Sequence, residues 1–307
     1  MKVYAAPEVH AALSWAALVH ALQQAFVAGA QVPLRHAHAL SADDTLLLMP
    51  AWNARVLVLK LVTVMPAAAA TVQATLLVCD RATGEPLAVL DGEAVTLRRT
   101  AATSALAAQH LARPDAHTLL IVGTGRLAPW MARAHWALRP GLQRVQVWGR
   151  RAKLAQARAR ELAAEGLPAQ AVCELEPAVR GACIVCCATT ATEPLALGAW
   201  LAPGTHLDLV GGFRPHMREV DDAAVASARI VVDTAAGALA EAGDLVQPLA
   251  RGVIDRSRIV AELSQLLSGT VAGRTRADEI TLFKSVGTAL ADLAAAQLVV
   301  LGDRAAG

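Results

Sequence analysis

HTLLIVGTGRLA, residues 117–128, is the stretch that decides the fold. Its first half contains the apolar run Leu119–Val122 and predicts a buried strand, and a helical pattern follows after the glycine turn. Between the two stands Gly123-Thr-Gly125-Arg-Leu-Ala128. The first glycine permits a tight turn, the second lets the backbone approach a pyrophosphate, and the alanine allows close helix–strand packing. The stretch therefore predicts a Rossmann-type dinucleotide site.

The amides at the start of the following helix would face the phosphates. The alternative is an ordinary strand–turn–helix that contains glycines, and the strand before and helix after the motif favour the dinucleotide interpretation. The cofactor contacts expected from this turn come from Gly123, Thr124, Gly125, Arg126, Leu127 and Ala128.

The chain beyond the turn alternates short apolar runs with helical patterns. Strands that are apolar throughout and alternate with helices indicate a parallel sheet covered on both faces. The fold class expected is therefore α/β, with a doubly wound parallel sheet. The expected strands are 117–123, 145–149, 181–189, 205–212 and 228–234, and the expected helices are 126–138, 151–165 and a long closing helix over 280–301.

The first hundred residues have a different pattern. An amphipathic helix is expected over 9–29 and strands over 45–66. Residues 71–90 predict a hairpin with its turn at 80–85. An alanine-rich helix over 100–112 should end at Arg113-Pro114-Asp115, which is the expected domain boundary.

The end of the second Rossmann strand bears on the choice of cofactor. An NAD site usually carries an acid there for the ribose 2′-hydroxyl, but this chain reads Gly149-Arg150-Arg151. A guanidinium pair suits a 2′-phosphate, so NADPH is favoured and NADH is the alternative. The competing interpretation is solvated charges at a helix start, where cations oppose the helix dipole.

Composition excludes several classes. The 307 residues are 55% hydrophobic and 18% charged, with a net charge of +2, which does not indicate a nucleic-acid partner. The longest apolar runs are far shorter than the ~20 residues that span a bilayer. The N-terminus lacks the apolar core of a signal peptide, so a cytoplasmic location without a membrane partner is expected.

No metal site is expected. Cys183 and Cys186 have CxxC spacing, but no second pair exists, and the run ACIVCCATT favours buried thiols in a core strand. His36, His38 and His206 have no metal-ligand spacing.

Cations in the first half are candidates for binding an anionic substrate. Lys60 lies inside the apolar run VLVLKLVTVMP, where a lysine is costly unless it is paired or functional. The alternative is a lysine on an exposed strand edge. Arg35 and Arg98-Arg99 could each clamp a carboxylate, although each taken alone is more often a surface charge.

Six segments, in this order, make the chain resemble the ornithine cyclodeaminase/mu-crystallin family over nearly its whole length. They are VLVLKLVTVMP (56–66), LRRTAATSALAAQHLA (97–112), LLIVGTGRLA (119–128), LDLVGGFRPHMREVDD (207–222), VVDTAAGALAEAGDL (231–245) and DEITLFKSVGTALADLAAAQLV (278–299).

The resemblance implies an α+β substrate-binding and dimerisation domain, residues 1–113 with 278–307, and an inserted Rossmann domain, residues 114–277. It implies a homodimer joined through the substrate domains. It also places Arg35, Lys60 and Arg99 at the family's substrate-carboxylate and active-site positions. The loop after LDLVGG matches the segment that faces the nicotinamide. The cofactor residues expected beyond the turn are Gly149, Arg150, Arg151, Thr189, Val210, Gly211 and Phe213.

Phe213 is a departure from the family's cyclodeaminases, which carry a catalytic Asp at this position. They also have an acid just before the Met-Pro that here is Met49-Pro50. A phenyl ring cannot act as a general base, so ornithine cyclisation is disfavoured. The stretch FRPHMREVDD instead resembles the family's ketimine reductases, which reduce Δ1-pyrroline-2-carboxylate or Δ1-piperideine-2-carboxylate.

The activity expected from this resemblance is NAD(P)H-dependent hydride transfer to a cyclic iminium carbon, giving L-proline or L-pipecolate. Arg35 and Arg99 would hold the carboxylate, and Lys60 would orient it or relay a proton. Two alternatives remain: a dehydrogenase that makes alanine or an N-alkyl amino acid, and a non-enzymatic nucleotide-binding protein like mu-crystallin.

Overall fold

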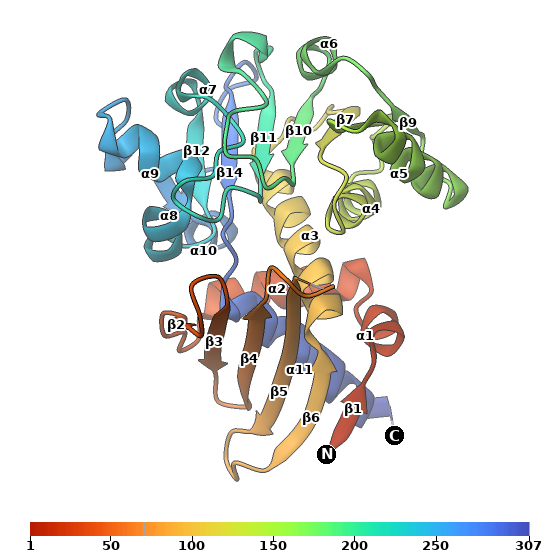
Figure 1. Ribbon diagram of the computed structural model, residues 1–307, viewed down its shortest axis with the longest axis vertical. Coiled ribbons are helices and arrows are strands. Elements are labelled where there is room, and N and C mark those ends of the chain that lie inside the picture. Colours follow the sequence, from red (N-terminus) through yellow and green to blue (C-terminus); the bar gives the residue numbers. More distant parts are fainter. Residues whose placement is uncertain (70, 307) are drawn as a thin grey trace. The chain divides into compact units, whose positions relative to one another are not determined.

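The computed structural model describes residues 1–69 and 71–306, and these divide into two compact units (Figure 1). Unit 1 comprises Met1–Thr100 and Thr288–Gly307, and unit 2 comprises Ala101–Gly287. Each unit has its own sheet. The chain therefore leaves unit 1, builds unit 2 and returns.

Six strands of the described part of unit 1 form a mixed sheet in the order β1-β6-β5-β4-β3-β2. The helices α2 and α11 pack on each other and against this sheet, and Figure 1 shows both behind it. The elements are β1 (Lys2–Tyr4), α1 (Ala6–Ala12), α2 (Trp15–Ala28), β2 (His36–Ala39), β3 (Thr45–Trp52), β4 (Val56–Val64), β5 (Val72–Asp80), β6 (Pro86–Asp91) and α11 (Ala289–Ala306), with the start of α3 (Gly92–Leu111).

Alternation along β4 separates the two faces of this mixed sheet. Val58, Lys60 and Val62 are buried, whereas Leu59 and Leu61 between them are partly or largely exposed. Lys60 therefore lies on the face that packs against α11. Because β4 is flanked by β3 and β5, the alternative of a lysine on an exposed edge strand is wrong.

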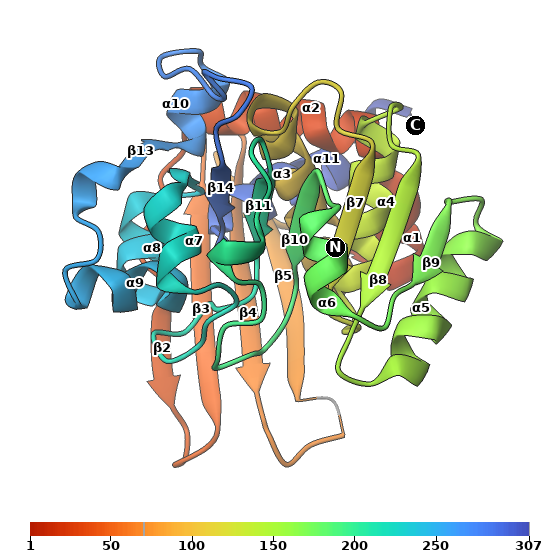
Figure 2. The ribbon, with the colours of Figure 1, turned by 90° about the horizontal axis from the view of Figure 1, so that it is seen from above.

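Eight strands of the described part of unit 2 form a parallel sheet in the order β13-β12-β14-β11-β10-β7-β8-β9; in Figure 2, β14, β11, β10, β7 and β8 stand side by side. The strands are β7 (Thr118–Val122), β8 (Arg144–Trp148), β9 (Ala169–Ala171), β10 (Ile184–Cys187), β11 (His206–Leu209), β12 (Arg229–Val232), β13 (Ile259–Glu262) and β14 (Thr281–Lys284). The helices, besides α3, are α4 (Ala128–Leu138), α5 (Ala152–Ala164), α6 (Leu175–Arg180), α7 (Asp222–Ser227), α8 (Ala235–Glu241), α9 (Gly243–Ala250) and α10 (Leu263–Leu267).

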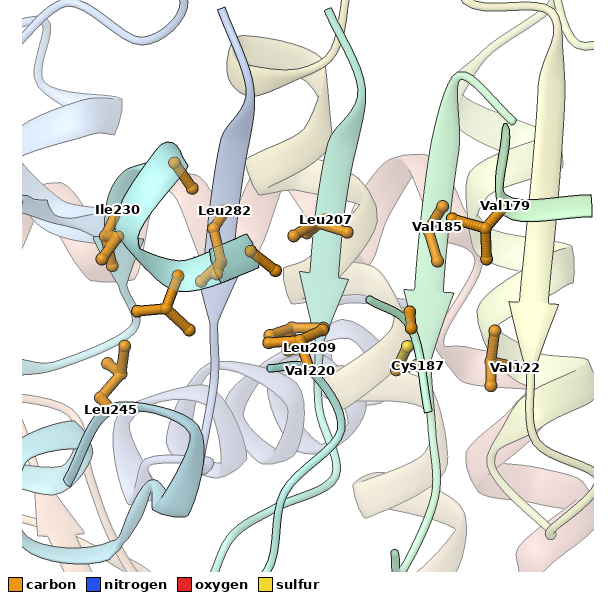
Figure 3. Packing of buried hydrophobic residues seen from close by; sticks show 14 of the residues in the cluster. Val122, Val179, Val185, Cys187, Leu207, Leu209, Val220, Ile230, Leu245 and Leu282 are labelled. Atoms are coloured by element: carbon orange, nitrogen blue, oxygen red, sulfur yellow. The ribbon is translucent and has the colours of Figure 1, made fainter. Parts of the chain in front are cut away.

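Both faces of this parallel sheet are covered. On one face, Val185, Leu207 and Leu282 pack with Val179 of α6 and Leu245 of α9 (Figure 3). On the other face, β11 turns a buried Asp208 toward His135 of α4, and the atoms Oδ2 and Nε2 are 2.9 Å apart. The expected α/β fold with a doubly wound sheet is confirmed.

Three expected elements differ from the structure. The helix expected over 9–29 is two helices, because Ser14 caps a new helix by accepting from the Ala17 amide. The helix expected over 100–112 already begins at Gly92, where Asp91 accepts from the Ala94 amide.

The expectation of one helix over 280–301 is wrong at its start. Residues Thr281–Lys284 form β14, between β11 and β12 in the parallel sheet. A short apolar run has no periodicity that separates strand from helix, and the helical pattern downstream extended the prediction too far. The described chain divides into its compact units at 100/101, within α3, and at 287/288, after β14; the domain boundaries expected at 113/114 and 277/278 stay predictions.

Among the described residues, no single helix has the length and apolar character needed to cross a membrane. Only α1 and α2 taken together reach that length, and they are bent by 77°.

We expect Leu282→Ala to lower the free energy of unfolding by about 3 kcal/mol, because Leu282 is fully buried in the sheet of unit 2. Leu154→Ala is the matched control: this leucine of α5 is 36% exposed and should cost less than about 1 kcal/mol. Urea unfolding measures both. Equal costs would contradict the placement of 281–284 in the sheet.

Candidate active site

The glycine turn connects β7 to α4. Gly123 has φ +132°, and a Cβ there would lie 2.5 Å from the Ala188 carbonyl oxygen, so only glycine fits. Its amide donates to the Trp148 carbonyl at 2.9 Å, which ties the turn to the end of β8. A Cβ on Gly125 would meet nothing within 4 Å. The turn is therefore packed tightly at its first glycine and open at its second.

The order of strands reverses beside this turn. From β7 the chain moves outward to β8 and β9, and then returns to the other side of β7 as β10. In open α/β sheets, ligands bind at such a switch point, beyond the carboxyl ends of the strands. Gly123 after β7 and Ala188-Thr189 after β10 flank this point, so Gly123 and Thr189 lie beside the switch point of the sheet.

The loop after β11 is packed against the loop after β10. A Cβ on Gly211 would lie 2.2 Å from the Thr189 carbonyl oxygen and 2.3 Å from Glu219 Oε1, so glycine is required there. Val210 is 8% exposed, whereas Phe213, three residues further along the loop, is 41% exposed. The structure thus brings Thr189, Val210 and Gly211 together and leaves Phe213 partly exposed to solvent.

Three fully buried ionisable residues lie beneath these two loops; we call Glu219, Asp244 and Lys284 the loop-anchoring cluster. Lys284 Nζ is 2.9 Å from Asp244 Oδ2 and also donates to the Gly211 carbonyl. Asp244 Oδ1 accepts from the amides of Glu219 (2.7 Å) and Val220 (3.1 Å). Glu219 Oε1 accepts from both the amide and the hydroxyl of Thr189. The cluster therefore ties both loops to β14 and α9.

Arg150 and Arg151 follow β8 and are both exposed. Neither guanidinium group makes a hydrogen bond or ion pair with a described residue, although the Arg151 carbonyl accepts from the amides of Leu154 and Ala155 at the start of α5. Gly149 before them packs on the turn, since a Cβ there would lie 2.5 Å from Thr124 Cγ2. Two guanidinium groups are thus presented to solvent at the strand end where a 2′-phosphate would be read.

Unit 1 contains a second buried charged group, the cation cluster of Lys60, Arg99 and Asp292. Lys60 Nζ lies 3.2 Å and Arg99 Nε 3.0 Å from the same oxygen, Asp292 Oδ1. Lys60 also donates to Thr96 Oγ1 at 2.6 Å. Relative exposures are 3% for Lys60, 6% for Arg99 and zero for Asp292, so the group carries one net positive charge out of bulk water.

Burial lowers the pKa of Lys60 from 10.5 to about 8. Asp292 opposes this shift, while the charges of Arg99 and Arg35 add to it. Burial alone would raise the pKa of Asp292, but Arg99 and Lys60 reverse the sign and lower it. Arg35, half-buried before β2, is thus near enough to act on Lys60, and all three expected cations belong to one region of unit 1.

Sequence reasoning missed Asp292, Asp244 and Lys284, and with them the loop-anchoring cluster that Glu219 completes. The available signal for Asp292 was a single acid in the otherwise apolar stretch after Thr288, together with a buried lysine that needed a counter-ion. Glu219, Asp244 and Lys284 come from three distant segments, and their meeting depends on β14 being a strand.

His135, Cys186 and Asp208 are the described side chains with metal-ligand chemistry that lie close together, with ligand atoms within 4.8 Å of one another. The separation of 2.9 Å between His135 Nε2 and Asp208 Oδ2 is that of a hydrogen bond. Burial raises the pKa of the Cys186 thiol well above its ordinary value. Hydrogen bonding around one buried carboxylate therefore accounts for this group.

The fold and these two charged clusters define a Rossmann-type protein with an additional α+β unit. The chain belongs to the ornithine cyclodeaminase/mu-crystallin family, whose profile matches residues 2–305. It is 36% identical over 316 residues to the Delta(1)-pyrroline-2-carboxylate reductase of Colwellia psychrerythraea, covering 98% of each chain. The family expected from the sequence is confirmed.

Two solved structures extend the comparison. Thermococcus litoralis Delta(1)-pyrroline-2-carboxylate reductase, in complex with NADH and L-proline, gives a TM-score of 0.94 at 32% identity, covering 100% of this chain and 98% of that one. An archaeal alanine dehydrogenase dimer with bound NAD gives 0.93 at 27% identity, covering 99% and 96%.

We expect Asp292→Asn to lower the free energy of unfolding at pH 7 by about 3 kcal/mol, because two buried cations lose their counter-ion. Since the folded-state pKa of Lys60 is about 8 and lies below its ordinary value, raising the pH through 8 discharges this lysine. The ion pair of Lys60 with Asp292 then contributes less to stability, so Asp292→Asn should lower the free energy of unfolding by less at pH 9.5 than at pH 7. Urea unfolding at both pH values measures this difference.

Asp43→Asn, at an exposed position of unit 1, is the matched control and should change stability by less than about 0.5 kcal/mol. A loss for Asp292→Asn that is the same at both pH values would contradict its pairing with a titrating Lys60.

Proposed function

We propose that the chain is an NAD(P)H-dependent ketimine reductase that converts Δ1-pyrroline-2-carboxylate to L-proline and, as the larger ring, Δ1-piperideine-2-carboxylate to L-pipecolate. The observation that carries the proposal is the cation cluster: Lys60 and Arg99 are buried and fixed by one oxygen of Asp292. A small anion is the ligand that such a site favours. The relatives at 36% and 32% identity supply the substrate class.

In this proposal Arg35, Lys60 and Arg99 bind the substrate carboxylate. At pH 7 Lys60 is below its pKa of about 8 and is charged. When bound, the reduced dinucleotide would supply the hydride for the carbon of the protonated C=N bond; the C=N π electrons would become the nitrogen lone pair, and the nicotinamide would be left oxidised. We assign Lys60 as the catalytic residue, because it would hold the substrate carboxylate, which is bonded to the reacting carbon, and could pass a proton to water. Alignment supplies much of the rate.

The cofactor proposed is NADPH, with NADH as the alternative. Gly123, Thr124, Gly125, Arg126, Leu127 and Ala128 would surround the pyrophosphate, and Gly149, Arg150 and Arg151 would receive the 2′-phosphate. Thr189, Val210, Gly211 and Phe213 would border the nicotinamide. The two solved relatives bind NADH and NAD, so support for NADPH comes only from the guanidinium groups of Arg150 and Arg151, which pair with no described residue.

A dehydrogenase that forms alanine or an N-alkyl amino acid is the second candidate, and it is favoured by the TM-score of 0.93 to an alanine dehydrogenase. The two activities differ in the source of nitrogen. A dehydrogenase of this kind needs added ammonia or amine, whereas a cyclic ketimine carries its own nitrogen. Cyclodeamination stays disfavoured because Phe213 offers no general base.

A homodimer joined through unit 1 is part of the proposal. The face of the mixed sheet that points away from α11 carries large apolar side chains that are partly or largely exposed, among them Leu57, Leu59 and Leu61. Such a face is typical of a surface that a second copy covers. The alanine dehydrogenase relative is a dimer.

We also propose a cytoplasmic location. All five cysteines are free thiols in the structure, as is usual for proteins of a reducing compartment.

Purified protein should oxidise NADPH when Δ1-pyrroline-2-carboxylate is added, without added amine, and form L-proline. Lys60→Met should lower kcat/KM by roughly 100-fold, because one charge-assisted contact to the carboxylate is lost. In the wild type, KM should rise as the pH passes through about 8, where Lys60 loses its proton, and Lys60→Met should lack this rise. Steady-state absorbance of the nicotinamide measures all three.

Lys2→Met, at an exposed position of unit 1, is the matched control and should keep wild-type kinetics. Absence of turnover with five- and six-membered ketimines, with either cofactor, would overturn the proposed function. Turnover only with pyruvate and ammonia would establish the second candidate.

Replacing both Arg150 and Arg151 by alanine should lower kcat/KM for NADPH by roughly tenfold or more and change that for NADH less than about threefold, since only NADPH carries the 2′-phosphate. Arg160→Ala is the control, because Arg160 is likewise an exposed arginine but lies further along, on α5; it should leave kcat/KM for both cofactors unchanged. Equal losses with both cofactors would refute the assignment of this arginine pair.

A further inference from the structure

Two loops converge on one buried carboxyl group, that of Glu219. The loop after β10 binds it through the Thr189 amide (2.8 Å) and hydroxyl (2.9 Å), both donating to Oε1. The loop after β11 lies against it at Gly211, where a Cβ would come within 2.3 Å of the same oxygen. Glu219 has zero exposure. Its position therefore fixes both loops that we propose to border the nicotinamide.

The loop-anchoring cluster contains two carboxyl groups and one ammonium group. Lys284 Nζ is 2.9 Å from Asp244 Oδ2 but 4.0 Å from Glu219 Oε2. Glu219 Oε2 makes no hydrogen bond to any described residue. A charged carboxylate oxygen left buried without a partner is costly, so Asp244 takes the ammonium and Glu219 is favoured in its neutral form.

The groups around Glu219 agree with this distribution. Burial raises the pKa of Glu219 to about 8, with Lys284 lowering it and Asp244 raising it. Cys186 and Cys187 on β10 are also influenced by the charge of Glu219. Burial raises the pKa of both thiols well above the ordinary value, so both stay neutral. Arg218, the preceding residue, is paired with Asp222 at 2.8 Å. Near pH 7 the cluster is therefore neutral overall.

We propose that Glu219 is a positioning residue of the nicotinamide site and that its proton is released in exchange for the positive charge of the oxidised ring. This inference rests on the proposed function. A reduced nicotinamide ring is neutral and matches a neutral cluster. Loss of the hydride leaves the ring with one positive charge, and release of the Glu219 proton leaves the cluster with one negative charge beside it. The dinucleotide's oxidation is thereby coupled to the departure of one proton to solvent.

Thermodynamic linkage makes this exchange measurable without catalysis. If the oxidised ring favours ionised Glu219, the affinity for NADP⁺ relative to NADPH must rise with pH as Glu219 loses its proton. The 2′-phosphate is present in both forms, so its own titration cancels from the ratio. We expect the ratio to rise about five- to tenfold between pH 6.5 and 9.5.

The test is titration of the full-length protein with NADPH and, separately, NADP⁺ across this pH range, followed by nicotinamide fluorescence and calorimetry. Glu219→Gln keeps the acceptor for Thr189 and mimics the neutral acid permanently, so it should flatten the ratio while preserving NADPH affinity within about threefold. Glu193→Gln makes the same chemical change at an exposed position and should keep the wild-type pH dependence.

A ratio in the wild type that is flat from pH 6.5 to 9.5 would overturn the inference, even if Glu219→Gln failed to fold. So would an unchanged slope in Glu219→Gln. Binding of both forms with a flat ratio would refute only the role of Glu219. Absence of binding by either form would refute the proposed function as well.

Discussion

The rest of the account depends on one buried interaction, the sharing of Asp292 Oδ1 between Lys60 and Arg99. A lysine in a central strand of an apolar sheet has a high desolvation cost, which appears in its lowered pKa. Asp292 offsets that cost only partly, because one carboxylate faces two cations. The remaining positive charge is held in place and poorly hydrated, which is the condition under which a substrate carboxylate gains most from binding.

The buried charged cluster of unit 2 has an excess of acids, whereas that of unit 1 has an excess of cations. The hydrogen bonds of the loop-anchoring cluster end on loop backbone: the amides of Thr189, Glu219 and Val220, and the Gly211 carbonyl. The excess carboxyl group of this cluster becomes neutral by gaining a proton, whereas the excess positive charge of the cation cluster persists at pH 7, below the pKa of Lys60. The cation cluster suits binding an anion, and the loop-anchoring cluster suits adjusting to a cofactor whose charge changes.

Local sequence was sufficient for the parts of the fold that repeat a known pattern. The turn at Gly123, the apolar strands and the hairpin of β5 and β6 follow from short-range periodicity and turn chemistry. Two helix starts were misplaced because Ser14 and Asp91, the capping residues, were not recognised as such. The strand β14 was missed because Thr281–Lys284 is only four residues long, too short for its pattern to separate a strand from the start of the helical pattern that follows.

The charged clusters show the same limit. Lys60 and Arg99 stood out as cations within apolar or helical segments, but Asp292 is 193 residues from Arg99 along the chain, and only the return of α11 to unit 1 brings the two together.

The central claim is that the chain reduces a cyclic ketimine by hydride transfer, and its most direct test is the fate of the transferred hydrogen. Reduction of Δ1-pyrroline-2-carboxylate with NADPH dideuterated at nicotinamide C4 should place one deuterium at C2 of L-proline, as seen by NMR and mass spectrometry. Label-free proline, or label on another product, would contradict it.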